Sequence, residues 1–397
     1  MVSKKKIMVV GGGKWQTPIV KKAADLGFYV VCSNLYKDSP AFKYAEHCYV
    51  ADVRDIKKNS QIAKQENISA IITDQSDIAV MTVASVAEKL NIPGIGLQCA
   101  SLFTNKYLMR SSLSIDGLNH PDYKLCHSLP DVQQFLAQVG FPAVLKPTSN
   151  QSSRGVNIVW KSEDVISAYQ DSLQHSSAGG VLCESYIVGN EYTVEGFKSP
   201  SGDYHILAIS RKEHFEQSPA VASALLYLQS HSEIDLNILE NISKMMFESL
   251  PFGITHCEFK VSNDKLYLIE AAVRGGGTKI SSTIIPMVSG YDVNEALIIS
   301  ACAGSPPPFL NEIPYVSVAL EFFDVSPGTV RSISGLDAIQ AHPAIVDAEV
   351  ELNIGDVVVA PKDDRSRIGY FIIKADTDIK LNEIRQEIKS MLKIEMG

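Results

Sequence analysis

The sequence predicts a mixed α/β and α+β chain, and three observations support this fold class. Its 397 residues are enough for two to three domains at about 150 residues per domain. Over roughly the first hundred residues, short apolar strands alternate with amphipathic helical patterns. Beyond residue 142, β-rich segments are joined by turns too short for crossover connections, which favours antiparallel hairpins.

Composition narrows the functional classes. Lys and Arg number 36 against 45 Asp and Glu, and the net charge of −9 argues against nucleic acid as a partner. No apolar run approaches the roughly 18 residues that a membrane span needs, and the short run at 7–10 ends in three glycines, unlike a signal peptide. The seven cysteines form no CxxC pair, so we expect reduced thiols. These features predict a soluble, cytoplasmic protein with no membrane partner.

The N-terminal segment, residues 1–115, is predicted to be a Rossmann-like parallel layer. Strands are expected at 7–10, 29–32 and 70–73, with helices at 16–26 and 77–90. Gly11 and Gly13 follow the first strand, but Gln16 stands where a dinucleotide-binding turn has its third glycine. An NAD-dependent oxidoreductase is therefore disfavoured, whereas a turn whose amides meet a substrate anion remains open.

The remaining chain is divided at two further points. Strands are expected at 143–146, 155–159, 180–184 and 192–198, and a last helix at 380–393. Three prolines at 306–308 mark a boundary. We therefore predict segments 116–185, 186–308 and 309–397, the last being a small α/β domain.

Lys146 lies inside an apolar strand, where an unpaired ammonium group is costly. The loop that follows, 148–155, is rich in hydroxyls and small residues and ends in Arg154 and Gly155. Such a loop can fold over phosphates while the lysine supplies charge. The alternative is a strand lysine paired with a neighbouring carboxylate.

A second polar pattern follows at 191–195. Strand alternation places Glu191, Thr193 and Glu195 on one face, with Tyr192 and Val194 facing inward. A carboxylate there can accept hydrogen bonds from ribose hydroxyls. A solvent-facing polar stripe is the alternative.

The pair Glu258 and Glu270 is the strongest signal. A three-residue loop centred on Asp264 would place the two carboxylates directly opposite each other on neighbouring strands. Two facing negative charges require a cation, and oxygen ligands suit Mg²⁺. Arg274 follows and precedes three glycines, so its guanidinium can hold a carboxylate or stabilise a transferred phosphoryl group.

In this order the residues resemble the ATP-grasp superfamily, in the branch that includes carbamoyl-phosphate synthetase halves, glycinamide ribonucleotide synthetase, biotin carboxylase and L-amino-acid ligases. The resemblance implies that 116–185 and 186–308 are the small and large lobes of the grasp and that 309–397 completes the large lobe. It implies ATP contacts at Lys106, Lys146, Ser152, Ser153, Arg154, Gly155, Glu184, Ser185, Tyr186, Ile187 and Glu191.

The same resemblance implies Mg²⁺ ligation by Glu258 and Glu270, with one or two ions that Mn²⁺ can replace, and catalytic roles for Glu270 and Arg274. The family pattern has an asparagine where this chain has Ala272, so a second ion would have fewer protein ligands. Candidate substrate contacts are Arg211, Lys212, His214, His256 and Gly276.

The implied function is an ADP-forming carboxylate–amine ligase that works through an acyl phosphate on an amino acid or similar small zwitterion. Activation of bicarbonate or formate is one alternative, and a non-catalytic ATP-binding module is another. Small-molecule carboxylates and amines are the expected partners, and a homodimer is expected from the resemblance alone.

Overall fold

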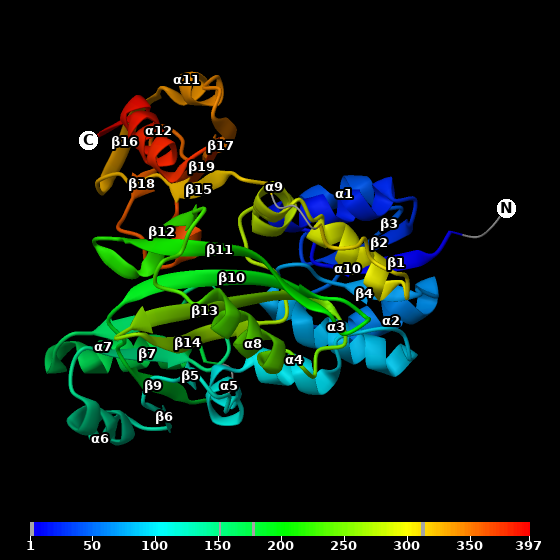
Figure 1. Cartoon of the computed structure of the whole chain (residues 1–397), viewed down its shortest axis with the longest axis horizontal. Coiled ribbons are helices and arrows are strands. Elements are labelled where there is room, and N and C mark those ends of the chain that lie inside the picture. The colour runs from blue at the N-terminus through cyan, green and yellow to red at the C-terminus, as the bar shows by residue number, and fades with distance from the viewer. Residues whose placement is uncertain (1–3, 151, 177–178, 311–313) are drawn as a thin grey trace.

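The computed structural model describes residues 4–150, 152–176, 179–310 and 314–397, and its N-terminal layer is a parallel sheet in the order β3-β2-β1-β4 (Figure 1). The strand β1 is buried along nearly its whole length, as expected for a sheet covered on both faces. This layer confirms the predicted strands and helices to within a few residues. Its elements are β1 (Lys6–Val10), α1 (Thr17–Asp25), β2 (Tyr29–Asn34), β3 (His47–Val50), α2 (Ile56–Glu66), β4 (Ala70–Ile72), α3 (Asp77–Leu90), α4 (Leu97–Thr104) and α5 (Lys106–Ser112).

The next unit is a small antiparallel sheet in the order β6-β9-β7-β8. A capping box between Ser128 and Asp131 begins its first helix. The predicted antiparallel pairing of this segment is confirmed. Its elements are β6 (Tyr123–Cys126), α6 (Leu129–Val139), β7 (Ala143–Pro147), β8 (Asn157–Val159), α7 (Val165–Gln174) and β9 (Val181–Ser185).

A nine-stranded sheet in the order β17-β19-β15-β12-β11-β10-β13-β14-β5 forms the centre of the molecule. It continues across the boundary predicted at residue 308, because β15 pairs with β12 and β19 pairs with β15. Its strands and the helices between them are β5 (Leu118–Asn119), β10 (Asn190–Lys198), β11 (Tyr204–Phe215), β12 (Ser218–Tyr227), α8 (Leu236–Met246), β13 (Gly253–Ser262), β14 (Lys265–Ala272), α9 (Ile285–Ser289), α10 (Val293–Ala301), β15 (Ser317–Phe322), β17 (Ile345–Val350) and β19 (Gly369–Ala375).

The other C-terminal elements form a three-stranded sheet with two helices. They are β16 (Gly328–Ser334), α11 (Leu336–Gln340), β18 (Val357–Val358), α12 (Asp378–Met391) and β20 (Lys393–Met396). The predicted last helix begins two residues earlier than expected, because Thr377 caps it by accepting a hydrogen bond from the Lys380 amide. The sequence prediction missed β20, whose short alternating pattern is stabilised only by its pairing with β16.

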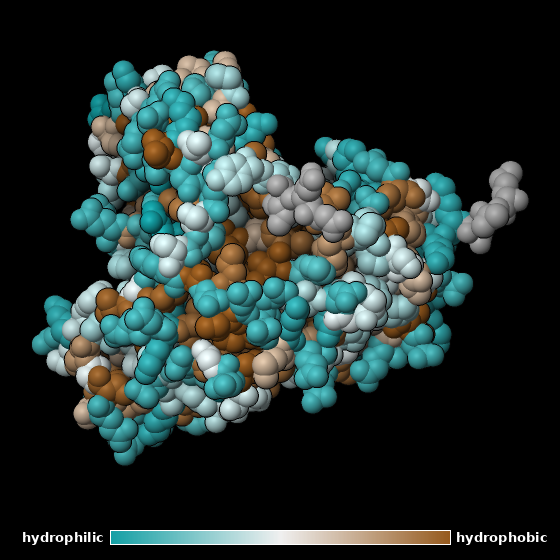
Figure 2. All heavy atoms as spheres, viewed as in Figure 1, coloured by the Kyte–Doolittle hydropathy of each residue, from teal (hydrophilic) through white to brown (hydrophobic). Residues whose placement is uncertain are grey.

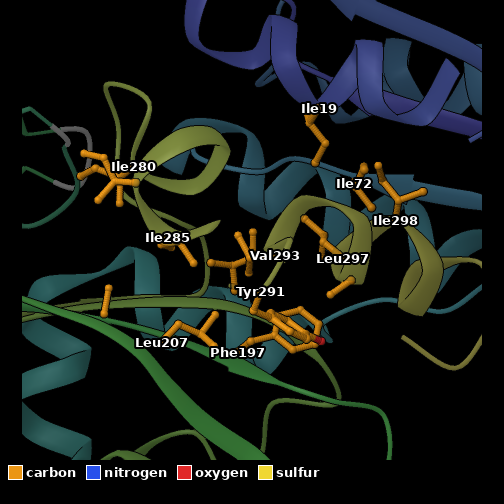
Figure 3. Packing of buried hydrophobic residues seen from close by; sticks show 14 of the residues in the cluster. Ile19, Ile72, Phe197, Leu207, Ile280, Ile285, Tyr291, Val293, Leu297 and Ile298 are labelled. Atoms are coloured by element: carbon orange, nitrogen blue, oxygen red, sulfur yellow. The ribbon is translucent and has the colours of Figure 1, made fainter. Parts of the chain in front are cut away.

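The largest hydrophobic cluster joins the N-terminal layer to the central sheet. Figure 3 shows Ile19 of α1 and Ile72 of β4 close to Leu297 and Ile298 of α10, with Phe197 of β10 beneath them. Figure 2 shows further hydrophobic residues in the hollow between the C-terminal elements at upper left and the rest of the molecule. The short helices α9 and α10 therefore connect the parallel layer to the central sheet through apolar packing.

No helix in the described ranges is long and apolar enough to cross a membrane. All seven cysteines are free thiols, and Cys48 alone among these seven is exposed. The prediction of unpaired, mostly buried thiols is thus confirmed.

Candidate active site

A cavity of about 640 Å³ lies where the parallel layer, the small sheet and the central sheet meet. Its wall includes Gln75 from the parallel layer, Lys146 from the small sheet and Glu258 from the central sheet. Residues distant in the sequence therefore converge on one cavity, which is the usual place for a ligand site.

The hairpin formed by β13 and β14 supplies the predicted carboxylate pair, and Glu258 does stand opposite Glu270. The predicted three-residue loop is wrong, because Ser262 pairs with Lys265 and leaves a two-residue turn at Asn263 and Asp264. Both turn residues have positive φ, of 49° and 58°, as a type I′ turn requires. A β-bulge next to Glu258 then shifts the register by one residue and restores the pair.

Basic side chains surround the two carboxylates. Lys212 Nζ lies 2.7 Å from Glu258, and Lys106 Nζ lies 3.2 Å from Glu270. Burial opposes ionisation of both glutamates. Lys212 and His256 nevertheless hold the pKa of Glu258 well below its ordinary value, and Lys106 and Arg274 lower the pKa of Glu270. Both carboxylates are therefore negatively charged at neutral pH.

Lys106 and Arg274 are held by neighbouring elements. Asn105 caps α5 by accepting hydrogen bonds from two backbone amides, which fixes Lys106 as the first residue of the helix. The guanidinium of Arg274 lies 3.9 Å from Glu270 and 3.4 Å from Asp77, at the start of α3. The arginine thus connects the carboxylate pair to the parallel layer.

Lys146 has the anionic partner that its burial requires. Its ammonium lies 2.7 Å from Glu184, which also lies 2.8 Å from Arg110. Burial lowers the pKa of Lys146 despite the opposing effect of Glu184. Lys146 and Glu184 both line the cavity, so the ion pair and the predicted phosphate contact are compatible.

Glu191 lies in a second charged group on the same face of the sheet. Its carboxylate is 2.8 Å from Lys212, 3.5 Å from His214 and 3.8 Å from Lys260. Burial opposes ionisation, but Lys212 and His214 lower the pKa of Glu191 to about 2. Lys212 therefore bridges the carboxylates of Glu191 and Glu258.

His256 is joined through Glu195 to the three glycines at 275–277, called the glycine turn below. Its Nδ1 lies 2.6 Å from Glu195, whose other oxygen accepts a hydrogen bond of 3.3 Å from the Gly276 amide. A Cβ atom at Gly276 would lie 2.8 Å from this carboxylate, so the close approach requires glycine. Burial alone would lower the pKa of His256, but Glu195 raises it to about 9.

Most of the predicted site residues line the cavity. These are Lys106, Lys146, Ser152, Ser153, Arg154, Glu184, Ser185, Tyr186, Ile187, Glu191, Lys212, His214, His256, Glu258, Glu270, Arg274 and Gly276.

Arg211 and Gly155 are two exceptions. Successive residues of a strand point to opposite faces, so Lys212 faces the cavity while Arg211 lies beside Glu213 at 3.2 Å. Gly155 accepts a hydrogen bond from Ser172 instead of lining the cavity. The alternative of a solvent-facing polar stripe on β10 is wrong, because Thr193 and Glu195 are as deeply buried as Tyr192 and Val194.

The sequence prediction missed several residues of the site, among them Lys260, Asp77 and Arg367. Lys260 donates a hydrogen bond to the Ile187 carbonyl and lies over the Tyr186 ring. Strand alternation from Glu258 could have identified Lys260. Asp77 and Arg367 reach the site through tertiary packing, for which the sequence carries no local signal.

The two facing glutamates fit a Mg²⁺ ion. Within the described residues, no three His, Cys, Asp or Glu side chains are grouped so that they could hold a metal ion. Mg²⁺ commonly takes one or two carboxylates and completes its shell with phosphate and water oxygens. Glu258 and Glu270 would supply the two carboxylates, whereas the side chain of Ala272 has no ligand atom.

Comparisons with known proteins identify two domains in the chain. Residues 139–282 match the ATP-grasp domain, and residues 321–397 match the L-amino acid ligase C-terminal domain 2. The matched domain, the fold and the cavity together define an ATP-grasp enzyme.

Several relatives resemble the whole chain. It is 23% identical to the formate-dependent phosphoribosylglycinamide formyltransferase of Bacillus subtilis (strain 168), over 94% of this chain and 92% of the relative. The crystal structure of L-amino acid ligase from Bacillus licheniformis superposes with a TM-score of 0.82 at 21% identity, over 100% of both chains. Phosphoribosylglycinamide synthetase from Anaerococcus prevotii gives a TM-score of 0.75 at 17% identity, also over 100% of both chains. At these identities the structural likenesses establish the fold.

Proposed function

We propose that this chain is an ADP-forming ligase that joins a carboxylate to an amine through an acyl phosphate, with an amino acid or similar small zwitterion as a substrate. The pairing of Glu258 with Glu270 carries the proposal, because it places two ionised carboxylates among Lys106, Lys212 and Arg274 in one cavity. This charge arrangement suits phosphoryl transfer, which depends mainly on positioning and charge neutralisation.

The nucleotide would occupy the part of the cavity beside the small sheet. Lys146, Arg154 and the strand end at Ser185 line that part. Lys106 donates a hydrogen bond to the Asn150 carbonyl, so it contacts both the loop that follows Lys146 and the carboxylate of Glu270. Segments 116–185 and 186–308 would then act as the two lobes that enclose ATP, with 309–397 extending the larger lobe.

In the proposed reaction, an oxygen of the substrate carboxylate attacks the γ-phosphorus of ATP, and the bond to ADP breaks. The amine then attacks the acyl carbon and phosphate leaves. Mg²⁺ held by Glu258 and Glu270 would supply neutralisation of the phosphate charge. Lys106 and Lys146 would orient the phosphates, and Arg274, fixed by Asp77, would hold the carboxylate or the acyl phosphate.

Trapping of the acyl phosphate tests the proposal. The chain would be incubated with ATP, Mg²⁺, hydroxylamine and single carboxylates, and ADP and hydroxamate would be measured. We expect stoichiometric ADP and hydroxamate with at least one amino acid. Binding of Mg·ATP without ADP or hydroxamate from any carboxylate would instead support a non-catalytic nucleotide-binding module.

Formate activation is a second candidate, because the Bacillus subtilis relative over nearly the whole chain is a formate-dependent phosphoribosylglycinamide formyltransferase. The same assay separates the two functions. Formate-dependent ADP formation that requires phosphoribosylglycinamide, with no amino-acid hydroxamate, would favour formyl transfer. Bicarbonate-dependent ADP formation would favour carboxylation.

A further inference from the structure

On the cavity face of the central sheet, one row of cross-strand neighbours is charged at one end and apolar at the other. Lys260 pairs with Glu191, Glu191 with Lys212, Lys212 with Leu225, and Leu225 with Leu320. All five residues line the same cavity. The cavity therefore has a charged end at β13, β10 and β11 and an apolar end at β12 and β15.

The apolar end is formed by Leu225, Ile280, Leu320, Phe322 and Tyr370, each at most 7% exposed. Phe322 pairs with Tyr370 across β15 and β19, and the Tyr370 ring meets Trp15 of the parallel layer at 5.8 Å. Apolar side chains of the central sheet and the parallel layer thus surround this end of the cavity. It is suited to bind an apolar group, which would be removed from water there.

The apolar end directly adjoins the glycine turn after Arg274. A Cβ atom at Gly276 would lie 2.7 Å from the Ile280 side chain, so Ile280 packs against that turn. If the carboxylate of a substrate amino acid is held near Arg274, the side chain of that amino acid can therefore reach the apolar end.

Basic residues around the apolar end are paired with carboxylates. Arg367 lies over the Phe322 ring and 2.8 Å from Asp364, and Arg365 lies 2.8 Å from Asp363. A phosphate dianion would have to compete with these carboxylates for the guanidinium groups. This pairing argues against a sugar phosphate at the apolar end.

We infer that the amino acid activated by this enzyme carries an uncharged, apolar side chain of about leucine to phenylalanine size, bound by Leu225, Ile280, Leu320, Phe322 and Tyr370. The inference rests on the proposed ligase function and adds the class of the activated substrate. The carboxylate would lie toward Arg274 and the side chain toward β12 and β15.

The unmodified chain provides the first test, through kcat/KM for hydroxamate formation from single L-amino acids. We expect leucine, methionine or phenylalanine to exceed glycine, serine, aspartate and lysine by at least about tenfold, as burial of an apolar side chain predicts. Equal or better use of glycine, of a charged amino acid or of formate would overturn the inference while leaving a ligase. Absence of ADP and hydroxamate with every carboxylate would overturn the proposed function, and the inference with it.

Matched variants of β12 then locate the side-chain site. Leu225→Ala is expected to lower kcat/KM for the preferred apolar amino acid by about tenfold relative to glycine. Leu226→Ala is the control, because Leu226 is equally apolar but packs on the opposite face of β12 with Phe371 and Ile373. An unchanged preference in Leu225→Ala, or the same change in both variants, would contradict the assignment. If Leu225→Ala does not fold, the substrate panel on the unmodified chain still decides the inference.

Discussion

At the scale of single residues, Lys212 explains how Glu191 and Glu258 remain ionised inside the cavity. Its ammonium lies 2.8 Å from Glu191 and 2.7 Å from Glu258. Lys106 and Arg274 likewise keep the carboxylate of Glu270 ionised. Protein cations thus neutralise these carboxylates, and this limits the cost of burying the charges.

The first prediction concerns Glu270. Glu270→Gln should lower kcat for ADP formation on the order of 100-fold or more, because it removes the negative charge proposed to bind Mg²⁺ beside the phosphates. The fold should persist, since the amide keeps the shape of the side chain. Steady-state ADP release and thermal unfolding would be measured, with Glu240→Gln on the exposed face of α8 as control. Full activity in Glu270→Gln would remove the metal assignment.

The second prediction concerns Asp74, whose pKa burial raises to about 7. The pKa of an unfolded aspartate is about 3.9, so the folded chain binds more protons between roughly pH 4 and pH 7. This contribution to the free energy of unfolding is present below about pH 4 and is lost as pH rises through about 7, with a total of about 4 kcal/mol.

Asp74→Asn should remove this pH dependence and be more stable than the unmodified chain at pH 8. Urea unfolding at pH 5 and pH 8 would measure the difference for both proteins. Asp25→Asn is the control, because Asp25 lies on the exposed surface beside Lys21. Parallel pH profiles for Asp74→Asn and the unmodified chain would contradict the prediction.

At the scale of elements, the β13–β14 hairpin shows what the sequence could predict and what it could not. Strand pattern and separation were enough to place Glu258 opposite Glu270. They could not separate a three-residue loop from a two-residue turn followed by a bulge, because both give this same pair. The positive φ values at Asn263 and Asp264 decide for the shorter turn.

Local features of the fold could be predicted from the sequence, whereas contacts between distant elements could not. Parallel and antiparallel layers were predictable because periodicity and turn length are local properties. The contact of Asp77 with Arg274, and the arrival of Arg367 at the cavity, depend on how distant elements pack. Side-chain alternation along β11 places Lys212 in the cavity wall and turns its neighbour Arg211 to the other face.

The third prediction tests the turn. Asp264→Gly should raise the free energy of unfolding by about 0.5–1 kcal/mol, because glycine adopts the observed positive φ without the strain of a side chain and Asn-Gly is favoured in type I′ turns. Asp264→Val should lower it, since a β-branched residue strongly disfavours positive φ. Equilibrium urea unfolding of both variants provides the measurement. Equal stability of the two variants would argue against the two-residue turn.

At the scale of the whole molecule, ion pairs join segment 347–351 to the N-terminal layer and to the residues that follow the glycine turn. Lys14 pairs with Glu349 and Glu351 of the C-terminal segment, and Lys279 pairs with Asp347 of β17. Thr278 and Lys279 hold positive φ values between the glycine turn and α9. The parallel layer, the small sheet and the central sheet all line the cavity, so a ligand bound there should stabilise the chain as a unit.

The fourth prediction concerns metal and nucleotide. Mg·ATP at about 100 times its Kd should raise the free energy of unfolding by about 2.7 kcal/mol, because it binds only the folded chain. EDTA without nucleotide should leave the thermal unfolding temperature nearly unchanged, since Lys106 and Lys212 already neutralise the glutamate pair. EDTA added with ATP should remove most of the stabilisation, because the triphosphate would then meet Glu258 and Glu270 without the cation between them.

Thermal unfolding followed by circular dichroism, with and without each ligand, would measure these effects. Glu270→Gln is the matched comparison: it should bind Mg·ATP more weakly and therefore show less stabilisation at the same ligand concentration. Unfolding of the unmodified chain by EDTA alone would indicate a structural metal site elsewhere, and stabilisation by ATP that is insensitive to EDTA would separate nucleotide binding from the carboxylate pair. The second outcome would contradict the proposed role of Glu258 and Glu270, because that role requires the metal to act together with the nucleotide.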